Sequence, residues 1–361
     1  MKELEETRER IASVDEQMAR LFEERMNLSA TILECKVRSG LPVYDPEQEA
    51  KVLAAGAGRM QDPVKAEYYT LFQKAMMGWS KAYQTRLMAG MKVAYSGVKG
   101  AFADIAVNRL FPDAEHISCP DFDSAYAACE KGEADAAVLP LENSTAGVVG
   151  RVMDLCFSGS LYINNVSDLC ITQNLLGVKG ARLSDIRKVV SHPQALFQCG
   201  SYISSHGFET QEYANTASAA EMVAKLGDKT VAAIASAETA ELYGLEILEK
   251  DISASHTNTT RFATFSRSMH QPLADARDES FILVFTVKDE AGALAKALNI
   301  IGANGFNMSS LHSRPLEGPH WRHYFFAELE GNARGSEGQD LLRQLATVCA
   351  RVKLVGCFRR G

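Results

Sequence analysis

The sequence lacks the cysteine patterns that mark disulfide frameworks and metal sites. Its eight cysteines, among 361 residues, are scattered without a CxxC pair and without the cysteine–histidine spacing of a zinc site. It also has no apolar run close to the ~20 residues that cross a bilayer, and the opening residues, MKELEETRER, do not have the pattern of a secretory signal. We therefore expect reduced thiols, a cytoplasmic location and no membrane partner.

Positive charge is also in short supply. The chain has 38 lysines and arginines against 45 aspartates and glutamates, which gives a formal net charge of −7. General binders of nucleic acid carry the opposite balance, so we expect no nucleic-acid partner, and any anionic ligand must be held by a local cluster of cations. The 46% of hydrophobic residues is typical of a folded globular protein, and the length predicts two or three domains.

Residues 1–90 have a helical pattern. Apolar residues occupy the a and d positions of four successive heptads: Leu4, Ile11, Val14, Met18, Leu21, Leu28 and Ile32. This seam predicts one long helix, and the capping pairs Asp45-Pro46 and Asp62-Pro63 predict two shorter helices after it. Three helices this thin cannot bury their apolar faces alone, so we expect an intertwined dimer.

Residues 91–272 alternate between strand and helix patterns. The β-rich runs are Lys92–Tyr95, Ala136–Leu139, Lys188–Ser191, Val231–Ala235 and Arg261–Ser266. Two of them open similar stretches, AAVLPLENS at 136–144 and VAAIASAET at 231–239. We predict an α/β domain with largely parallel sheets and two lobes, like a periplasmic binding protein, with a ligand cleft at the strand ends.

Residues 280–361 follow a polar linker, DARDES at 275–280. The predicted elements are Phe281–Val287, Gly292–Ala303, Asn307–Arg314, Arg322–Glu330, Glu337–Ala350 and Val352–Phe358. Their order, βαββαβ, is that of a ferredoxin-like α+β domain. The sequence therefore predicts three domains, all-α at 1–90, α/β at 91–272 and α+β at 280–361.

A charged residue interrupts the apolar seam of the first helix. Arg25 falls on an a position, where a buried guanidinium needs either a glutamate of a neighbouring helix or a bound anion. Lys36 lies about 20° around the helix and ~16 Å along it, so both cations could converge on one small dianion. Arg8 lies about 25 Å before Arg25, so it can join such a site only from a second chain.

With these cations, the polar residues of the second and third helices complete a recognisable set. Residues 4–88 resemble the all-helical chorismate mutase family, whose substrate-binding motif carries onto Arg8, Arg25, Lys36, Asp45, Glu49, Ser80 and Gln84. Gln48 stands where many members have arginine. The resemblance implies that chorismate rearranges to prephenate through positioning and charge stabilisation alone. It also implies that Lys36 and Gln84 are catalytic, as donors to the ether oxygen of the breaking bond.

Five short runs in the middle segment each fit a helix cap or a β-former when taken alone. They are YSGVKGAF at 95–102, PLENSTAG at 140–147, SHPQALFQC at 191–199, NTASAA at 215–220 and TRF at 260–262. Together they resemble the prephenate dehydratase family over residues 91–268. The resemblance implies that prephenate loses water and CO2 to give phenylpyruvate, and that Thr260 is the residue essential for proton delivery. His192 is an alternative acid, although histidine before proline at a helix start is more often a cap.

The other residues of these runs are assigned by the same resemblance. Arg261 holds a carboxylate or orders the loop, and Phe262 forms the wall against the ring. The pocket-lining hydrogen-bonding groups are Glu142, Asn143, Ser144, Ser191 and Gln198.

Two stretches of the C-terminal segment resemble the ACT regulatory domain. They are Gly292-Ala293-Leu294 and His312-Ser313-Arg314-Pro315, where the family usually has glutamate in place of His312. In that family the two stretches, from adjacent subunits, bracket phenylalanine at a dimer interface. Here they could instead be ordinary helix packing and a strand end.

The three resemblances predict one bifunctional enzyme of phenylalanine biosynthesis, an isomerase and a carbon–oxygen lyase under feedback inhibition by phenylalanine. They imply a homodimer or homotetramer, with no metal and no organic cofactor. Two alternatives remain open. One is a dehydratase that prefers arogenate, and the other is a non-catalytic amino-acid sensor.

Overall fold

The computed structural model describes residues 2–39, 46–255, 257–269, 279–316 and 322–359. The predicted site residue Asp45 lies outside these ranges. The chain divides into two compact units, Met1–Met91 and Lys92–Gly361.

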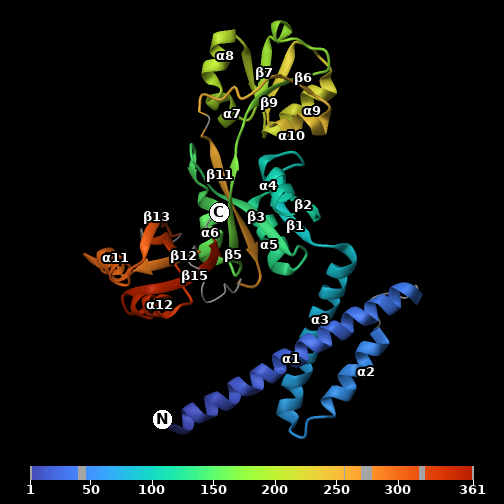
Figure 1. The fold of residues 1–361 in the computed structure, drawn as a ribbon, viewed down its shortest axis with the longest axis vertical. Helices are drawn as coiled ribbons and strands as arrows, with labels where there is room; N and C mark the ends of the chain where they lie inside the picture. The colour runs from blue at the N-terminus through green and yellow to red at the C-terminus, as the bar shows by residue number, and fades with distance from the viewer. Residues whose placement is uncertain (1, 40–45, 256, 270–278, 317–321, 360–361) are drawn as a thin grey trace. The chain divides into compact units, whose positions relative to one another are not determined.

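The first unit consists of three helices (Figure 1): α1 (Lys2–Ser39), α2 (Pro46–Ala57) and α3 (Pro63–Ala89). The predicted cap of the third helix is confirmed, because the Asp62 carboxylate accepts hydrogen bonds from the backbone N–H groups of Val64 and Lys65. The long first helix is confirmed as well, since it runs unbroken through all four heptads.

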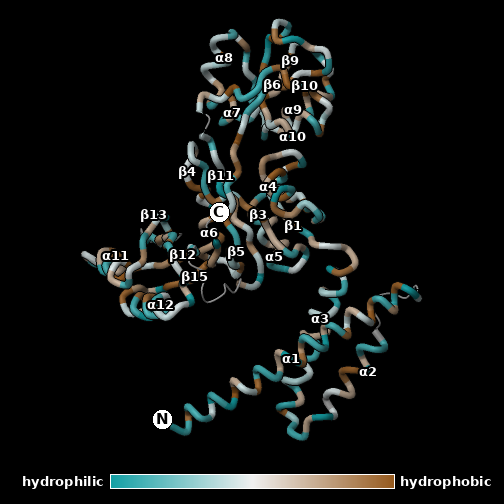
Figure 2. Tube along the Cα trace, in the orientation of Figure 1, coloured by the Kyte–Doolittle hydropathy of each residue, from teal (hydrophilic) through white to brown (hydrophobic). Residues whose placement is uncertain are grey.

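The apolar seam of α1 is exposed in the single chain. Leu21 is 63% exposed and Ile11 is 56% exposed, and Figure 2 shows apolar positions recurring along the helix. A different face of α1, which includes the buried Ser29 and Leu33, is turned to α3. The seam is therefore a surface of the single chain, with four heptads of apolar residues in contact with water.

The second unit begins with two α/β lobes. The first lobe has the sheet order β2-β1-β3-β11-β5, and the second has β8-β7-β9-β6-β10. The strands of the first lobe are β1 (Lys92–Ser96), β2 (Glu115–Cys119), β3 (Ala136–Asn143), β5 (Tyr162–Cys170) and β11 (Thr259–Ser266), and β4 (Gly147–Val148) pairs with β3. Those of the second are β6 (Asn174–Gly177), β7 (Lys188–Ser191), β8 (Glu209–Glu212), β9 (Val231–Ala235) and β10 (Glu246–Glu249).

The similarity of the two halves has a structural basis. In each lobe the repeated apolar run, β3 or β9, lies between a parallel neighbour and an antiparallel one. The prediction of largely parallel sheets holds only among β1, β2 and β3 in the first lobe and among β7, β8 and β9 in the second. Elsewhere the sheets are mixed, because β11 returns from the second lobe and runs antiparallel to both β3 and β5.

Helices cover both lobes. They are α4 (Phe102–Leu110), α5 (Phe122–Lys131), α6 (Gly150–Ser158), α7 (Pro193–Gln198), α8 (Gly200–His206), α9 (Thr216–Leu226) and α10 (Ala237–Tyr243), with a 3₁₀ turn at Leu183–Asp185.

The C-terminal part has the predicted βαββαβ order. Its elements are β12 (Glu279–Val287), α11 (Ala293–Ala303), β13 (Asn307–Pro315), β14 (His323–Glu330), α12 (Ser336–Val348) and β15 (Cys349–Arg359), with the sheet order β13-β14-β12-β15. Phe281, Leu283 and Phe285 pack in one core with residues of α11 and α12. The alternating residues Ile282 and Val284 belong to a second core.

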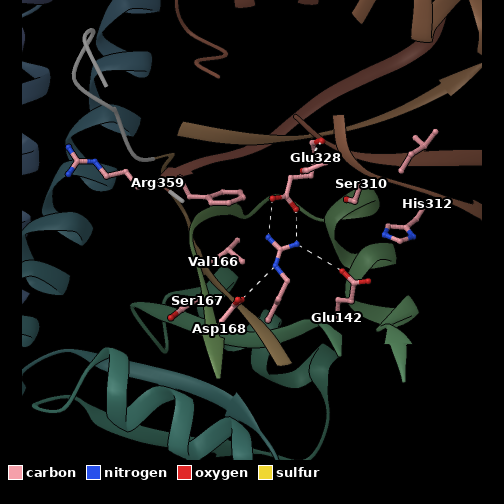
Figure 3. Close-up of a pocket in the computed structure, with 12 residues that line it drawn as sticks. Glu142, Val166, Ser167, Asp168, Ser310, His312, Glu328 and Arg359 are labelled. Carbon is pink, nitrogen blue, oxygen red and sulfur yellow. Dashed lines mark hydrogen bonds and ion pairs between the residues drawn. The ribbon is translucent and has the colours of Figure 1, made fainter. Parts of the chain in front are cut away.

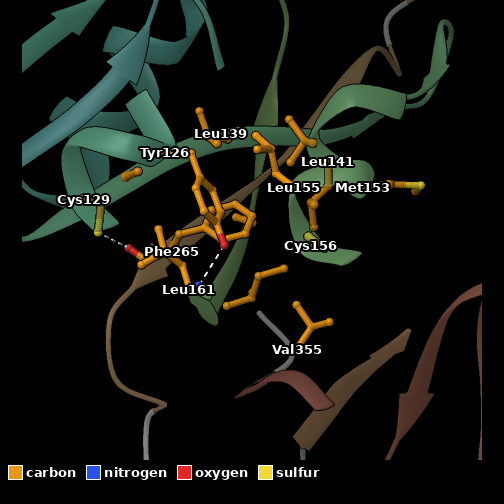
Figure 4. Packing of buried hydrophobic residues seen from close by; sticks show 14 of the residues in the cluster. Tyr126, Cys129, Leu139, Leu141, Met153, Leu155, Cys156, Leu161, Phe265 and Val355 are labelled. Carbon is orange, nitrogen blue, oxygen red and sulfur yellow. Dashed lines mark hydrogen bonds between the residues drawn. The ribbon is translucent and has the colours of Figure 1, made fainter. Parts of the chain in front are cut away.

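That second core is shared with the first lobe. Val355 of β15 and Tyr324 of β14 belong to it, together with Leu139, Met153 and Leu161 of the two-lobed part (Figure 4). A parallel bridge between Gly356 and Ile163 also joins β15 to β5, so the two sheets form one continuous sheet. The C-terminal domain is thus attached to the first lobe through both its core and its sheet.

Gly356→Ala is expected to weaken this junction. A Cβ at Gly356 would clash with the carbonyl oxygen of Ile163, so the strands must separate. We expect the free energy of unfolding to fall by about 1–3 kcal/mol, as measured by urea denaturation. The control is Gly302→Ala in α11, where the new methyl meets open space among the described residues and alanine favours the helix. Equal stability of both variants would contradict the close junction.

Candidate active sites

A hydrogen-bond pair joins the ends of β3 and β11. Thr260 and Asn143 lie opposite each other in the ladder, and Asn143 Nδ2 donates to Thr260 Oγ1 at 2.9 Å. Asn143 Oδ1 accepts from the backbone N–H groups of Thr145 and Ala146, which fixes the orientation of its amide. The Thr260 hydroxyl thus accepts one hydrogen bond and keeps its proton to donate. Thr260 is 9% exposed.

Asn258 extends this pair to the second lobe. Its Oδ1 accepts from Asn143 Nδ2 at 2.8 Å, and its Nδ2 donates to Gln198 Oε1, on α7, at 3.1 Å. Asn258 was not among the site residues predicted from the sequence. Asn258 lies two residues before Thr260, and in an extended chain such residues face the same side. This spacing was the sequence signal for its place in the site. We call Thr260, Asn143, Asn258 and Gln198 the cleft network.

Two further predicted site residues, Ser144 and Ser191, form hydrogen bonds that join neighbouring parts of the backbone. The Ser144 hydroxyl donates to the Thr257 carbonyl at 3.1 Å and accepts from the Thr259 N–H at 3.0 Å, so it holds the loop after β3 against β11. Ser191 is fully buried, and its hydroxyl donates to the Ile234 carbonyl at 2.6 Å. Ser191 therefore links β7 to β9 inside the second lobe.

His192 caps α7. Its Nδ1 accepts a hydrogen bond from the Gln194 N–H at 3.2 Å. This is the capping arrangement that the sequence offered as the alternative to an acid, and it occupies one ring nitrogen of the imidazole.

Arg261 and Glu142 point away from the cleft network. They form the next pair of the β11–β3 ladder, and successive residues of a strand face opposite sides. The Arg261 guanidinium pairs with Glu328 and lies within 4.0 Å of two carboxylates of the two-lobed part, Glu142 and Asp168. Figure 3 labels the three acidic residues. Hydrogen bonds to Glu328 are the main cause that raises the pKa of Arg261.

A cavity of about 200 Å³ opens between the lobes on the Thr260 side of the sheet. Leu169, which lies opposite Thr260 in the β11–β5 ladder, forms part of its lining. Arg109 of α4 supplies a cation to the lining and pairs with Glu238 at 3.1 Å. The sequence carried no signal for Arg109. Phe262 is buried two residues beyond Thr260.

In the helical unit, Arg25 and Gln84 join α1 to α3. Arg25 Nη1 donates to the hydroxyl of Ser80, and Gln84 Nε2 donates to the carbonyl and hydroxyl oxygens of Ser29 at 2.7 and 3.0 Å. Ser80 and Gln84 are buried. The structure thus brings together three predicted residues, and within the described ranges Arg25 contacts a neutral hydroxyl instead of a glutamate.

The other described members of that set are Glu49, Lys36 and Arg8. Glu49 of α2 forms an ion pair with Lys81 of α3 at 2.6 Å, a partner that the sequence reasoning missed. Lys36 is half-buried in the last part of α1. Arg8 is exposed and lies about 25 Å along the same helix from Arg25, so the structure does not bring it to the group within one chain.

The C-terminal stretches occupy two different places. Gly292, with φ of 80°, precedes α11, Ala293 is buried, and Leu294 packs in the helix-covered core. The other stretch, Ser313-Arg314-Pro315, ends β13.

Arg314 reaches the first lobe. Its guanidinium donates two hydrogen bonds to Asp154 of α6, at 2.9 and 2.8 Å, and the Tyr324 hydroxyl donates a third to the same carboxylate. Burial opposes the charge of Asp154, but the bonds from Arg314 and Tyr324 prevail and lower its pKa. His312 lines a larger cavity of about 760 Å³ between β13, β14 and the first lobe.

The described residues lack two kinds of feature. They contain no group of three histidine, cysteine, aspartate or glutamate side chains that could hold a metal ion. Among the same residues, no helix is long and apolar enough to span a membrane.

Known proteins resemble the chain along most of its length. Three family models match it in succession: chorismate mutase type II over residues 7–85, prephenate dehydratase over 93–270 and the ACT domain over 281–347. The bifunctional chorismate mutase/prephenate dehydratase of Neisseria gonorrhoeae is 32% identical over 354 residues, which cover 97% of this chain and 95% of that protein.

Two solved structures are similar to the second unit. The prephenate dehydratase of Arthrobacter aurescens in complex with L-Phe has a TM-score of 0.70 and 28% identity, and covers 75% of this chain and 90% of that one. GqqA, described as a novel type of quorum quenching acylase, has a TM-score of 0.70 and 32% identity, and covers 75% of this chain and 98% of that one.

Proposed function

The chain belongs to the family of bifunctional chorismate mutase/prephenate dehydratases with an ACT domain, and on this premise we propose which of its residues carry the two reactions. It rearranges chorismate to prephenate and converts prephenate to phenylpyruvate in phenylalanine biosynthesis. A relative that aligns over 97% of the chain is named for both activities, so neither the arogenate-preferring dehydratase nor the non-catalytic sensor is favoured. The cleft network is the observation that carries the residue assignment.

In the dehydratase reaction, Thr260 delivers a proton to the leaving hydroxyl of prephenate. The ring hydroxyl departs as water, the ring carboxylate departs as CO2, and the electrons of the broken C–C bond complete the aromatic ring. A hydroxyl is a weak acid by itself. The hydrogen bond that Thr260 accepts from Asn143 polarises it and directs its proton away from β3.

The other cleft residues position prephenate between the lobes. Gln198 and Asn258 hold the lobes at one separation, and Arg109 offers a cation to a carboxylate in the cavity beside Leu169. Arg261 faces the opposite side of the sheet, so of its two predicted roles we favour the ordering of β11.

In the mutase reaction, a small group of donors stabilises the charge that develops on the ether oxygen. Lys36 and Gln84 supply those donors, and the Gln84 amide does so by exchanging one of its hydrogen bonds to Ser29 for one to chorismate. Arg25, fixed by Ser80, holds a carboxylate of chorismate. The exposed seam of α1 supports a dimer, in which Arg8 of the second chain completes the site.

The ACT domain responds to phenylalanine at the two predicted stretches, Gly292-Ala293-Leu294 and Ser313-Arg314-Pro315. Support comes from the similar A. aurescens structure, which holds L-Phe. The dimer or tetramer that would bring such stretches together from adjacent subunits is part of this proposal. The eight free thiols suit the reducing cytoplasm in which we place the enzyme.

The direct test is to feed chorismate to the purified protein and to follow prephenate and phenylpyruvate separately. We expect prephenate to appear first and phenylpyruvate to follow, and added prephenate to give phenylpyruvate without chorismate. Failure to form either product would contradict the proposed function.

Hybrid dimers test the shared mutase site. Arg8→Ala and Lys36→Ala each remove one residue of every mutase site in a homodimer. In a mixed dimer, one site combines both substitutions and the other has neither. At random exchange about half of the dimers are mixed, and each has one intact site of two. We therefore expect mutase activity to return to about a quarter of the wild-type value. Absence of recovery, with subunit exchange confirmed by a tag, would contradict a site built from two chains.

A further inference from the structure

An arginine fork joins the ACT domain to the strand of Thr260. Arg261 Nη1 and Nη2 donate to the two carboxylate oxygens of Glu328, on β14, at 2.8 and 3.0 Å. The Glu328 side chain is only 5% exposed. Such bidentate pairs fix orientation more firmly than a single hydrogen bond. Because Thr260 precedes Arg261 in the chain, the fork lies one peptide unit from the proposed proton donor.

The strand is paired less regularly on its β3 side than on its β5 side, where the ladder runs without a shift from Thr259 to Thr264. The pairing of β11 with β3 shifts register between Arg261 and Phe262. A shift of this kind disrupts the ladder locally and leaves the course of the strand to other contacts. The Arg261–Glu142 pair lies immediately before the shift, and the Thr260–Asn143 pair lies one position earlier. A displacement of Arg261 therefore moves Thr260 relative to Asn143.

Arg261 also has other carboxylates within reach. Asp168 and Glu142, from the strands on either side, lie 3.8 and 4.0 Å from its nitrogens (Figure 3). The group lines the cavity of about 760 Å³, which gives the guanidinium room to turn. Loss of the Glu328 charge therefore redirects Arg261 toward these neighbours and does not leave an unpaired buried cation.

We propose that Glu328 is a positioning residue of the dehydratase reaction. It holds Arg261, and with it the start of β11, so that the Thr260 hydroxyl stays aligned with Asn143 and with prephenate. The proposal rests on the proposed function, in which Thr260 delivers the proton. It makes the ACT domain a structural support of the dehydratase site.

Glu328→Gln in the full-length protein tests the proposal, because it removes the charge and keeps the shape of the side chain. Without phenylalanine, we expect kcat for prephenate to fall about tenfold while KM stays within about twofold. A structural role alone would lower the melting temperature and leave kcat unchanged. Mutase activity of the same preparation serves as an internal standard, since the mutase residues lie in the other unit.

Asp154→Asn is the matched control. It removes the carboxylate of the other arginine fork between the same two domains and leaves Arg261 untouched. We expect its kcat for prephenate to stay within about twofold of wild type. If Glu328→Gln does not fold, Glu328→Asp replaces it, with an expected loss in kcat of at least about threefold.

The outcomes separate the two proposals. Wild-type kcat in Glu328→Gln, or equal losses in Glu328→Gln and Asp154→Asn, would overturn the positioning role. A wild-type protein that does not convert prephenate at all would instead overturn the proposed function.

Discussion

Thr260→Ala should stop the pathway at prephenate. The substitution removes the hydroxyl that accepts from Asn143 and donates to the leaving group, so we expect kcat for prephenate to fall by about 10²–10⁴. The mutase site lies in the other unit, and chorismate should still disappear at the wild-type rate. The measurement is the accumulation of prephenate from chorismate, followed together with phenylpyruvate.

Thr260→Ser is the control for that result. It keeps the hydroxyl and loses only a methyl group, so it should retain most of the dehydratase activity. If Thr260→Ala converts prephenate as fast as Thr260→Ser, the hydroxyl does not deliver the proton, and the acid must be sought elsewhere in the cleft.

Lys36→Ala should have the reciprocal effect. We expect it to lower mutase kcat by about 10²–10³, because it removes a cation from the place where the ether oxygen gains negative charge. Added prephenate should still give phenylpyruvate at the wild-type rate. Steady-state assays of the two half-reactions on one preparation measure both effects.

A surface lysine of the same unit provides the control. Lys65, in the first turn of α3, has a well-exposed side chain. Its ammonium group makes a long ion pair, 4.0 Å from the Asp62 carboxylate. Lys65→Ala should keep full mutase activity. A similar loss in both lysine variants would mean that net charge of the unit, and not the position of Lys36, governs the rate.

Local patterns predicted most of the helices and the C-terminal domain. The heptads of α1 and the cap at Asp62 are local signals, and both act within one element. The strand β5, Tyr162–Cys170, was missed, because it carries polar residues such as Asn164, Asn165 and Asp168 among its apolar ones. Its place is set by pairing with β11, about a hundred residues later in the chain, which no local pattern contains.

The sequence predicted the site residues that contact residues of other motifs. It did not predict the contacts that motif residues make with other parts of the fold. Asn143, Gln198 and Thr260 came from separate motifs and lie in one network. Strand alternation places Arg261 on the opposite face from Thr260. Its partner Glu328 follows 67 residues later in another domain, and only the packing of that domain on the first lobe makes the contact.

The most direct test of two independent sites on one chain is to feed chorismate to a mixture of Thr260→Ala and Lys36→Ala proteins. The first variant keeps the mutase site and the second keeps the dehydratase site. Prephenate released by one should be consumed by the other, so phenylpyruvate should form from the mixture although neither variant alone makes it at an appreciable rate. If the mixture gives no phenylpyruvate while each variant retains its own half-reaction, the two sites do not act independently, and the account is contradicted.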